Sequence, residues 1–297
     1  TDFDPEFPSP DTDGGRLRMR NAVNLLSHAS ADWGHTPTCW QQSLYPAELR
    51  PRISVLHEGI DTDLVRPDAN ARFRLPGAGL TLTAGDEVIT YVARNLEPYR
   101  GFHIAMRAIG EIQRRRPKAR FVIVGGDDVS YGGPPPDGTT YRQKMLAELA
   151  GRLDLSRIHF TGPLPYADYL NLLQISSAHI YLTYPFVLSW SLLEAMSAGC
   201  AVIGSATPPV EEAIRPGENG MLVDFFSPAS IADAVDVVLD DPDATRAMRE
   251  GARRTIIETY DLRTRMLPQW DRLLDTLAAR RRPDAPEIDG PALRLVG

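Results

Sequence analysis

The amino-acid sequence predicts an α/β protein with a Rossmann-like, doubly wound parallel sheet. Two observations support this fold class. Short runs of β-branched and aromatic residues alternate with stretches in which apolar residues recur every three or four positions, which is typical of a parallel sheet with helices on both faces. The length of 297 residues accommodates one complete domain of this kind and part of a second.

The first elements of the chain do not make a domain by themselves. Residues 16–31 are expected to be a helix because Leu17, Val23 and Leu26 fall near one helical face. Residues 53–57 are expected to be a buried strand. Residues 1–52 are too few for a core of their own, so we interpret them as the remnant of another domain and place a boundary near residue 52.

Residues 53–260 contain the regular alternation and are expected to form one domain. The predicted strands are VITYVA, FVIVGG, IHFTG, IYLTY, AVIGS and MLVDF, and the predicted helices lie near 101–116, 140–152, 166–176, 191–198, 228–239 and 243–258. A Gly/Pro-rich loop at 127–139 follows the second of these strands. A last helix is expected within 261–279, and residues 280–297 are expected to be a flexible tail.

The composition excludes several classes of protein. The 32 Lys and Arg residues against 39 Asp and Glu residues give a net charge of −7, which argues against a nucleic-acid binder. The chain lacks any apolar run near the roughly 18–20 residues of a membrane span. The two cysteines exclude a disulfide framework and favour a reducing compartment, and the first residues show no secretory signal, so we expect a cytoplasmic protein.

Ligands of open parallel α/β sheets bind at the carboxyl ends of the strands, so the residues there are candidates for a site. Arg94 follows one predicted strand, and Arg100 precedes the next helix at Gly101. Two planar guanidinium groups beside a helix N-terminus suit a diphosphate. The alternative is that both arginines are solvated surface residues, and their position favours the binding role. Glycines that would let a ligand approach the backbone follow several strands: Gly59, Gly125, Gly126 and Gly162.

Glu194 has two interpretations. A carboxylate near a helix start can accept hydrogen bonds from a ribose diol. Ser191 and Glu194 also have the spacing of a capping box, in which the glutamate folds back onto the first turn of the helix. The spacing alone favours the cap.

The sequence gives no support for a metal or another cofactor. Asp61-Thr62-Asp63 and Asp11-Thr12-Asp13 have a form that some sugar-transferring enzymes use to hold a metal, but the first is better explained as a turn. The six histidines lack metal-ligand spacing. The sequence also lacks a dinucleotide fingerprint and a phosphate-binding P-loop.

Several segments together resemble a known family, from about residue 53 to residue 279. They are HEGIDTDLVRP, YVARNLEPYRGF, FVIVGG, IHFTGPLPYADYLNLLQISSAHIYLTYPF, SLLEAMSAGCAVIGS and VEEAIRPGENGMLVD. The chain is similar in these segments to glycosyltransferase family 4 (glycosyl transferases group 1), the retaining nucleotide-sugar transferases of the GT-B fold. The resemblance implies that this is mainly the donor-binding domain and that residues 1–52 end an acceptor domain.

The resemblance also implies roles for individual residues. Arg94 matches the family's diphosphate-binding arginine, and Arg100 stands where the family usually has a lysine before glycine. Glu194 matches the second glutamate of a paired-glutamate motif that holds the ribose hydroxyls. The backbone amides of Leu192 and Leu193 would meet a phosphate, and the backbone from Thr161 and Gly162 to Leu164 would frame the base.

One departure from the family concerns the donor sugar. The first glutamate of the motif stands eight positions before the second, and that position holds Phe186 here. The usual Phe-Gly pair that follows is Leu188-Ser189. Since the first acid normally reaches the donor sugar, Phe186 and Ser189 bear on the choice of sugar and on the rate.

The expected function is retaining transfer of a sugar from a nucleoside diphosphate to an acceptor, without a metal. The acceptor is unknown: a saccharide, a lipid-linked sugar, which would bring the chain to a membrane surface, or a small molecule. The chain by itself is expected to need its acceptor domain for activity. Two alternatives are kept, a non-catalytic nucleotide-sugar-binding module and another GT-B enzyme such as a nucleotide-sugar epimerase.

Overall fold

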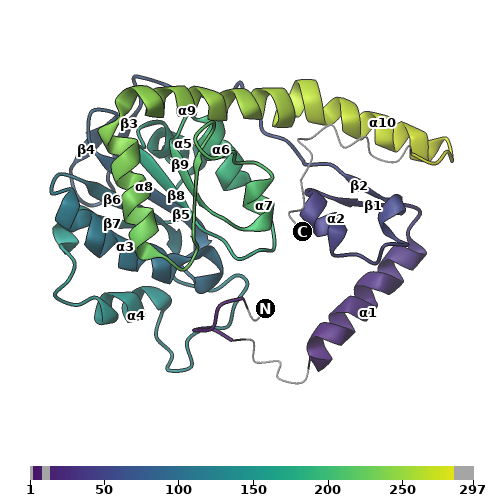
Figure 1. Ribbon diagram of the computed structural model, residues 1–297, viewed down its shortest axis with the longest axis horizontal. Helices are drawn as coiled ribbons and strands as arrows, with labels where there is room; N and C mark the ends of the chain where they lie inside the picture. Colours follow the sequence, from purple (N-terminus) through teal and green to yellow (C-terminus); the bar gives the residue numbers. More distant parts are fainter. Residues whose placement is uncertain (1–2, 9–13, 284–297) are drawn as a thin grey trace.

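The computed structural model describes residues 3–8 and 14–283. Figure 1 shows a larger part that contains the main sheet and a smaller part that contains the first elements of the chain. A long C-terminal helix extends from the larger part over the smaller one. In the described part of the chain, no helix is both long and apolar enough to cross a bilayer.

The main sheet has six strands in the order β10-β9-β8-β5-β6-β7, and all of their pairings are parallel. They are β5 (Val88–Asn95), β6 (Arg120–Gly126), β7 (Ile158–Gly162), β8 (Ala178–Tyr181), β9 (Val202–Ser205) and β10 (Met221–Val223). The chain builds outward from β5 to β7, then returns to the other side of β5 as β8. The predicted α/β class is confirmed, and the reversal between β5 and β8 creates the crevice where such sheets bind ligands.

Helices cover both faces of this sheet because its strands alternate their side chains. Ile89 and Tyr91 of β5 enter one apolar cluster with α3 and α8, and Val92 packs against a second cluster formed largely by α5, α6 and α9. The helices are α3 (Phe102–Arg115), α4 (Tyr141–Glu148), α5 (Tyr166–Gln174), α6 (Trp190–Ser197), α7 (Pro208–Glu211), α8 (Pro228–Asp240) and α9 (Pro242–Thr255). A short hairpin of β3 (Arg72–Arg74) and β4 (Thr81–Thr83), not predicted from the sequence, adds Phe73 and Leu82 to a third cluster.

The smaller part comprises α1 (Gly15–Ser30), β1 (Gly34–Thr36), α2 (Cys39–Ser43) and β2 (Ile53–Val55). The strand expected at residues 53–57 is present as β2, and it pairs in parallel with β1, with Gly34 opposite Ile53. The boundary predicted near residue 52 therefore falls between two paired strands. A run of apolar residues identifies a strand but not its neighbour, because the neighbour is set by the tertiary fold.

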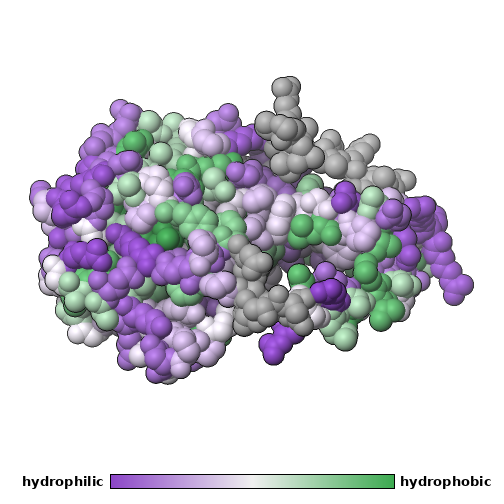
Figure 2. Space-filling model, turned by 60° about the horizontal axis from the view of Figure 1, so that its bottom comes forward, coloured by the Kyte–Doolittle hydropathy of each residue, from purple (hydrophilic) through white to green (hydrophobic). Residues whose placement is uncertain are grey.

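Helix α1 keeps most of its apolar side chains in solvent. Leu17, Met19 and Leu26 are at least 60% exposed, and His28 is the one buried residue of the helix. Figure 2 shows green hydrophobic patches on the smaller part, at the right of the view. This helix therefore gains little stability from packing within the described residues.

Glu212 and Trp270 help to attach the smaller part to the rest of the molecule. Glu212, after α7, accepts hydrogen bonds from the backbone N–H groups of Cys39 and Trp40 at 2.9 and 2.6 Å. The C-terminal helix α10 (Leu267–Ala278) places the indole N–H of Trp270 3.1 Å from the carbonyl oxygen of His57. The single helix expected at 262–279 is divided, since residues 262–266 form a wider turn before α10 begins.

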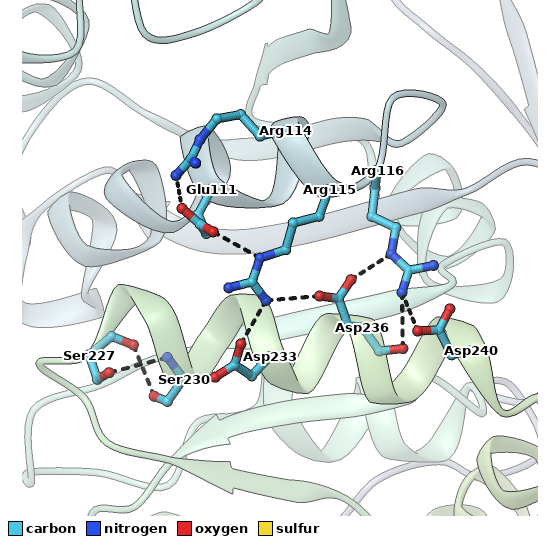
Figure 3. Close-up of polar contacts among 9 residues, drawn as sticks. All are labelled: Glu111, Arg114, Arg115, Arg116, Ser227, Ser230, Asp233, Asp236 and Asp240. Atoms are coloured by element: carbon cyan, nitrogen blue, oxygen red, sulfur yellow. Dashed lines mark hydrogen bonds and ion pairs between the residues drawn. The ribbon is translucent and has the colours of Figure 1, made fainter.

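A network of ion pairs joins α3 to α8 (Figure 3). The Asp236 carboxylate accepts from Arg115 at 2.8 Å and from Arg116 at 2.6 Å, and Arg115 also contacts Asp233. The helix predicted near 101–116 places these arginines only at its end. The structure adds that they cross-link it to a second helix on the same face of the sheet.

Replacing Asp236 by alanine is expected to lower the free energy of unfolding by about 1 kcal/mol, because two arginines lose their shared partner. The Asp236 side chain is 25% exposed and that of Asp233 is 67% exposed, so Asp233→Ala serves as the milder control. Urea unfolding in low and high salt measures both variants. The loss for Asp236→Ala should shrink in high salt, and equal losses for the two variants would contradict the central role of Asp236.

Buried His179 is expected to make stability depend on pH. Burial lowers its pKa from 6.5 to about 4 in the folded chain, and its Nδ1 lies 2.8 Å from the Thr90 hydroxyl. Below pH 6.5 the unfolded chain takes up a proton that the folded chain does not, so stability falls, by about 2 kcal/mol between pH 6.5 and 5. Unfolding of His179→Gln should show a shallower slope over this range, and the exposed-site control His35→Gln should keep the native slope.

Candidate nucleotide-sugar site

A cavity of about 690 Å³ lies at the carboxyl ends of β5, β6 and β8. Its volume is in the range of sites that bind a drug-sized ligand. The larger part supplies most of its walls, and Pro37 and Glu58 come from the chain around β1 and β2. The cavity is lined by Pro37, Glu58, Val92, Ala93, Arg94, Asn95, Arg100, Val124, Tyr131, Pro163, Leu164, Tyr169, Val187, Leu188, Ser189, Trp190 and Ser191.

Both predicted arginines line this cavity. Arg94 lies near the carboxyl end of β5 and is exposed. Arg100 is only 9% exposed, and its Nη1 donates to the Thr183 hydroxyl at 3.1 Å and to the Tyr181 hydroxyl at 3.3 Å. The structure therefore brings together one solvated and one rigidly held guanidinium group.

Aromatic rings cover the Arg100 guanidinium. Its central carbon lies 5.0 Å from the ring centre of Phe186 and 5.4 Å from that of Tyr131. Such cation–π contacts stabilise a guanidinium that has lost part of its water. Phe186, at the position where the resemblance implies an acid, therefore packs as an aromatic ring against the arginine, and Tyr131 reaches the cavity itself.

Glu97 holds the loop that carries Tyr131, a role that the sequence analysis missed. Its fully buried carboxylate accepts hydrogen bonds from three consecutive backbone N–H groups, those of Ser130, Tyr131 and Gly132, at 2.9, 3.1 and 2.9 Å. The Gly/Pro-rich loop at 127–139 is therefore ordered near the arginine. In the sequence, Glu97 is recognisable only as an acid three residues before Arg100. That position does not indicate which backbone groups its carboxylate binds.

Gly101 lets α3 begin directly beside Arg100. Its φ is +65°, and an added Cβ would lie 2.5 Å from the Leu182 Cβ and 3.0 Å from the Phe225 ring. Both the backbone conformation and the close approach of Leu182, directly after β8, therefore require glycine here. Because α3 begins directly after Arg100, the side chain of Arg100 is directed toward the cavity.

The capping interpretation of Glu194 is wrong. Helix α6 begins at Trp190 with Ser189 as its N-cap, whose hydroxyl accepts from the Ser191 N–H, so Glu194 lies beyond the first turn. The Glu194 carboxylate instead accepts from the hydroxyls of Tyr166 and Tyr169, at 2.7 and 2.8 Å. The spacing of Ser191 and Glu194 fits a cap, but it does not reveal where the helix begins, and the observed N-cap is two residues earlier.

Tyr169 connects Glu194 to the cavity. Its side chain lines the cavity, whereas Glu194 lies one layer behind it. Burial and the neighbouring Glu194 carboxylate both raise the pKa of Tyr169, which keeps its hydroxyl protonated and donating. Tyr169 could not be selected from the sequence, because tyrosine on an amphipathic helix is usually a core residue.

Some of the other predicted site residues line the cavity and others lie outside its lining. Leu164 and Ser189 line it. Leu192 and Leu193 are fully buried in α6, and the Leu192 N–H donates to the Ser189 carbonyl at 3.1 Å. Thr161 uses its hydroxyl on the adjacent carbonyl of Gly162. The phosphate and base contacts implied for these residues remain predictions.

Three predicted glycines are packed against the chain itself. A Cβ on Gly59 would lie 2.9 Å from the Leu262 Cα, and one on Gly125 would lie 2.8 Å from the Ala93 carbonyl oxygen. A Cβ on Gly126 would lie 2.5 Å from the Asn95 side-chain oxygen. The close approaches to backbone atoms and the positive φ angles explain Gly59 and Gly125 without a ligand, whereas the obstacle at Gly126 is the end of a flexible side chain. The role of all three glycines in donor binding stays a prediction.

The aspartate pairs do not form a metal centre in the described residues. The Asp61 carboxylate accepts from the N–H groups of Asp63 and Leu64, as expected for a turn. Asp11 and Asp13 lie outside the described residues. Within the described ranges, no group of three His, Cys, Asp or Glu side chains is placed to hold a metal ion.

Comparison with known proteins identifies the family. The family described as glycosyl transferases group 1 matches residues 80–255, more than half of the chain. The chain belongs to this family. A second family, the glycosyl transferase family 4 group, matches residues 1–65. The predicted resemblance is thereby confirmed, and the six-stranded sheet, together with most residues that line the cavity, lies within the matched group 1 segment.

The curated relatives are longer than this chain. It is 31% identical to the D-inositol 3-phosphate glycosyltransferase of Corynebacterium glutamicum over 247 residues, which are 82% of this chain and 56% of that protein. It is 28% identical to the protein of the same name from Mycobacterium bovis, with 83% of this chain and 47% of that protein covered. The chain thus spans about half the length of these relatives.

Solved structures show the same GT-B fold. The sucrose-phosphate synthase of Thermosynechococcus elongatus superposes with a TM-score of 0.69 at 20% identity, covering 92% of this chain and 64% of that one. Anabaena HepE in complex with UDP superposes with a TM-score of 0.67 at 20% identity, covering 91% and 70%. At these identities the likeness supports the fold alone.

Replacing Gly101 by alanine should destabilise the chain by more than the cost of the backbone conformation alone, which is about 1–3 kcal/mol. Gly151→Ala is the matched control, because Gly151 has φ +74° with nothing within 4 Å of an added Cβ. Urea unfolding of both variants separates strain from clash. Equal losses would show that the contact with Leu182 is not restrictive.

Proposed function

We propose that this chain is the donor-binding part of a retaining glycosyltransferase that moves a sugar from a nucleoside diphosphate to an acceptor. One observation carries the proposal: Arg94 and Arg100 line a single cavity at the point where the strand order of the sheet reverses. Diphosphate is doubly anionic or more at neutral pH, and paired guanidinium groups match its geometry.

The arginines assist departure of the diphosphate. In the proposed reaction the bond from the anomeric carbon to the diphosphate oxygen breaks, and a bond to the acceptor oxygen forms on the same face of the sugar. The diphosphate leaves with the bonding electron pair, and its departing oxygen accepts the proton that the acceptor hydroxyl loses. Because Arg100 is already fixed by Thr183 and Tyr181, its positive charge needs little reorganisation as negative charge develops.

The nucleoside is proposed to bind beside the arginines. Pro163 and Leu164 give the cavity an apolar wall suited to a base. Glu194 is proposed to reach the ribose hydroxyls by exchanging a hydrogen bond from Tyr166 or Tyr169 for one from the ribose. We also propose that the reaction needs no metal, because the two guanidinium groups and the N-termini of α3 and α6 supply positive charge.

The acceptor and the whole reaction belong to a longer protein in this proposal. Residues 1–52 are proposed to end its acceptor domain. The relatives are named as transferases that act on D-inositol 3-phosphate, and HepE structures contain UDP or UDP-glucose, which supports a nucleotide-sugar donor here. The free cysteines Cys39 and Cys200 support a cytoplasmic site of action.

A non-catalytic nucleotide-sugar-binding module is the second candidate. Phe186 favours it, since an apolar ring against Arg100 replaces an acid that would contact the donor sugar. Calorimetry with UDP and GDP, together with a donor-hydrolysis assay on the full-length protein, separates the two. Binding without turnover would support the module.

In the full-length protein, Arg100→Ala and Arg94→Ala should each reduce turnover by about 100-fold or more, because each removes a charge that stabilises the leaving diphosphate. Arg100→Lys should retain more activity than Arg100→Ala, since it keeps the charge without the planar geometry. Arg114→Ala, 73% exposed at the far end of α3, is the control and should turn over normally. Native turnover in both alanine variants would refute the proposed role.

A further inference from the structure

We propose that Asp4, in the N-terminal strap of residues 3–8, is a positioning residue that holds Arg100 in place for diphosphate binding. The proposal rests on the proposed function. Figure 1 shows the strap against the larger part, whereas the next element, α1, lies in the smaller part. The sequence of this segment, FDPEFP, is acidic and contains two prolines, and by itself it indicates no role.

Asp4 is an unusual strap residue because its carboxylate is buried, with 1% exposure. Its Oδ2 accepts a hydrogen bond from the Tyr184 hydroxyl at 2.7 Å and lies 3.0 Å from the His103 Nε2. Its Oδ1 accepts from the Glu6 backbone N–H at 2.9 Å. Burial alone would raise the pKa of Asp4, but the contacts with His103 and Tyr184 outweigh it and lower the pKa, so the group is ionised.

The Tyr184 side of Asp4 leads directly to Arg100. The Tyr184 backbone N–H donates to the Tyr99 carbonyl at 2.9 Å, and the two rings lie 4.6 Å apart. Thr183, which accepts from the Arg100 guanidinium, donates in turn to the Tyr184 carbonyl at 3.0 Å. Holding Tyr184 in place therefore holds both the turn that carries Arg100 and the Thr183 hydroxyl that the Arg100 guanidinium contacts.

The His103 side of Asp4 leads to the same arginine from the other direction. His103 lies in the first turn of α3, three residues after Arg100, and is 1% exposed. One carboxylate thus joins the loop after β8 to the start of α3, and Arg100 lies between these two segments. We call this link, in which Asp4 contacts both Tyr184 and His103, the bracket. It sets the separation of the two segments that define the position of the Arg100 guanidinium.

The rest of the strap anchors the bracket. Phe3 packs against Tyr184 and Phe225, with ring centres 5.1 and 5.2 Å apart, and Phe7 packs edge-on against His103. These ring contacts fix the strap, so Asp4 can transmit its position to the site. The Glu6 side chain instead forms an ion pair with Arg107 on the exposed side of α3, away from these rings.

The sign of one measurement separates positioning from simple electrostatics. A carboxylate near a diphosphate site repels the ligand, so removing its charge would strengthen diphosphate binding if Asp4 acted only as a charge. Removing it would weaken binding if Asp4 positions Arg100. A purely structural role would lower the melting temperature and leave the affinity of the folded protein unchanged.

The test is calorimetric binding of UDP and GDP to the full-length protein, well below the melting temperature. Asp4→Asn should weaken the affinity about tenfold, and Tyr184→Phe, which removes only the donating hydroxyl, should weaken it in the same direction. Glu6→Gln is the matched control from the same strap and should stay within twofold of the native affinity. In an Arg100→Ala background, Asp4→Asn should change the affinity by less than twofold, because the arginine it positions is gone.

Native or tighter binding by folded Asp4→Asn would overturn the positioning role. The same would follow if Asp4→Asn weakened the affinity of the Arg100→Ala protein as much as it weakens that of the native protein. If Asp4→Asn fails to fold, Tyr184→Phe alone decides, with the same outcomes. Native affinity in Arg100→Ala would refute the proposed function itself. Weak binding by Arg100→Ala with native binding by Asp4→Asn and Tyr184→Phe would refute the bracket alone.

Discussion

The buried guanidinium of Arg100 is the constraint around which this part of the molecule is organised. An arginine that is 9% exposed loses most of its water, and that loss is tolerated only if the protein supplies other partners. Two hydroxyls and two aromatic rings do so here. The result is a positive charge that is already oriented toward a cavity before any anion arrives.

The surrounding elements make sense as supports for that charge. Gly101 allows α3 to start against the end of β8, and buried Glu97 orders a loop that otherwise has the composition of a mobile segment. Both features carry a cost, one in backbone freedom and one in desolvation of a carboxylate. Such costs placed around one side chain are characteristic of a binding site and uncommon in an ordinary core.

Much of this could be predicted from the sequence, because the deciding information was local. Alternating strand and helix periods specified the α/β class and most elements of the main sheet. The rule that ligands bind at the carboxyl ends of parallel strands then selected Arg94 and Arg100, which the structure brings to one cavity. The same rule could not select Tyr131, Tyr169 or Trp190, because a loop tyrosine, a helical tyrosine and an exposed tryptophan have no distinctive pattern.

The sequence by itself determined the secondary-structure periods and the placing of two arginines at one edge of a sheet, since both follow from spacing along the chain. Tertiary structure alone decided that β2 pairs with β1, that Glu194 accepts hydrogen bonds from two tyrosines, and that Asp4 meets Tyr184 across 180 positions of sequence. The physical reason is the range of the interactions. Helical and strand periods are properties of neighbouring residues, whereas the partner of a buried polar group is whichever group the completed fold brings within hydrogen-bonding distance.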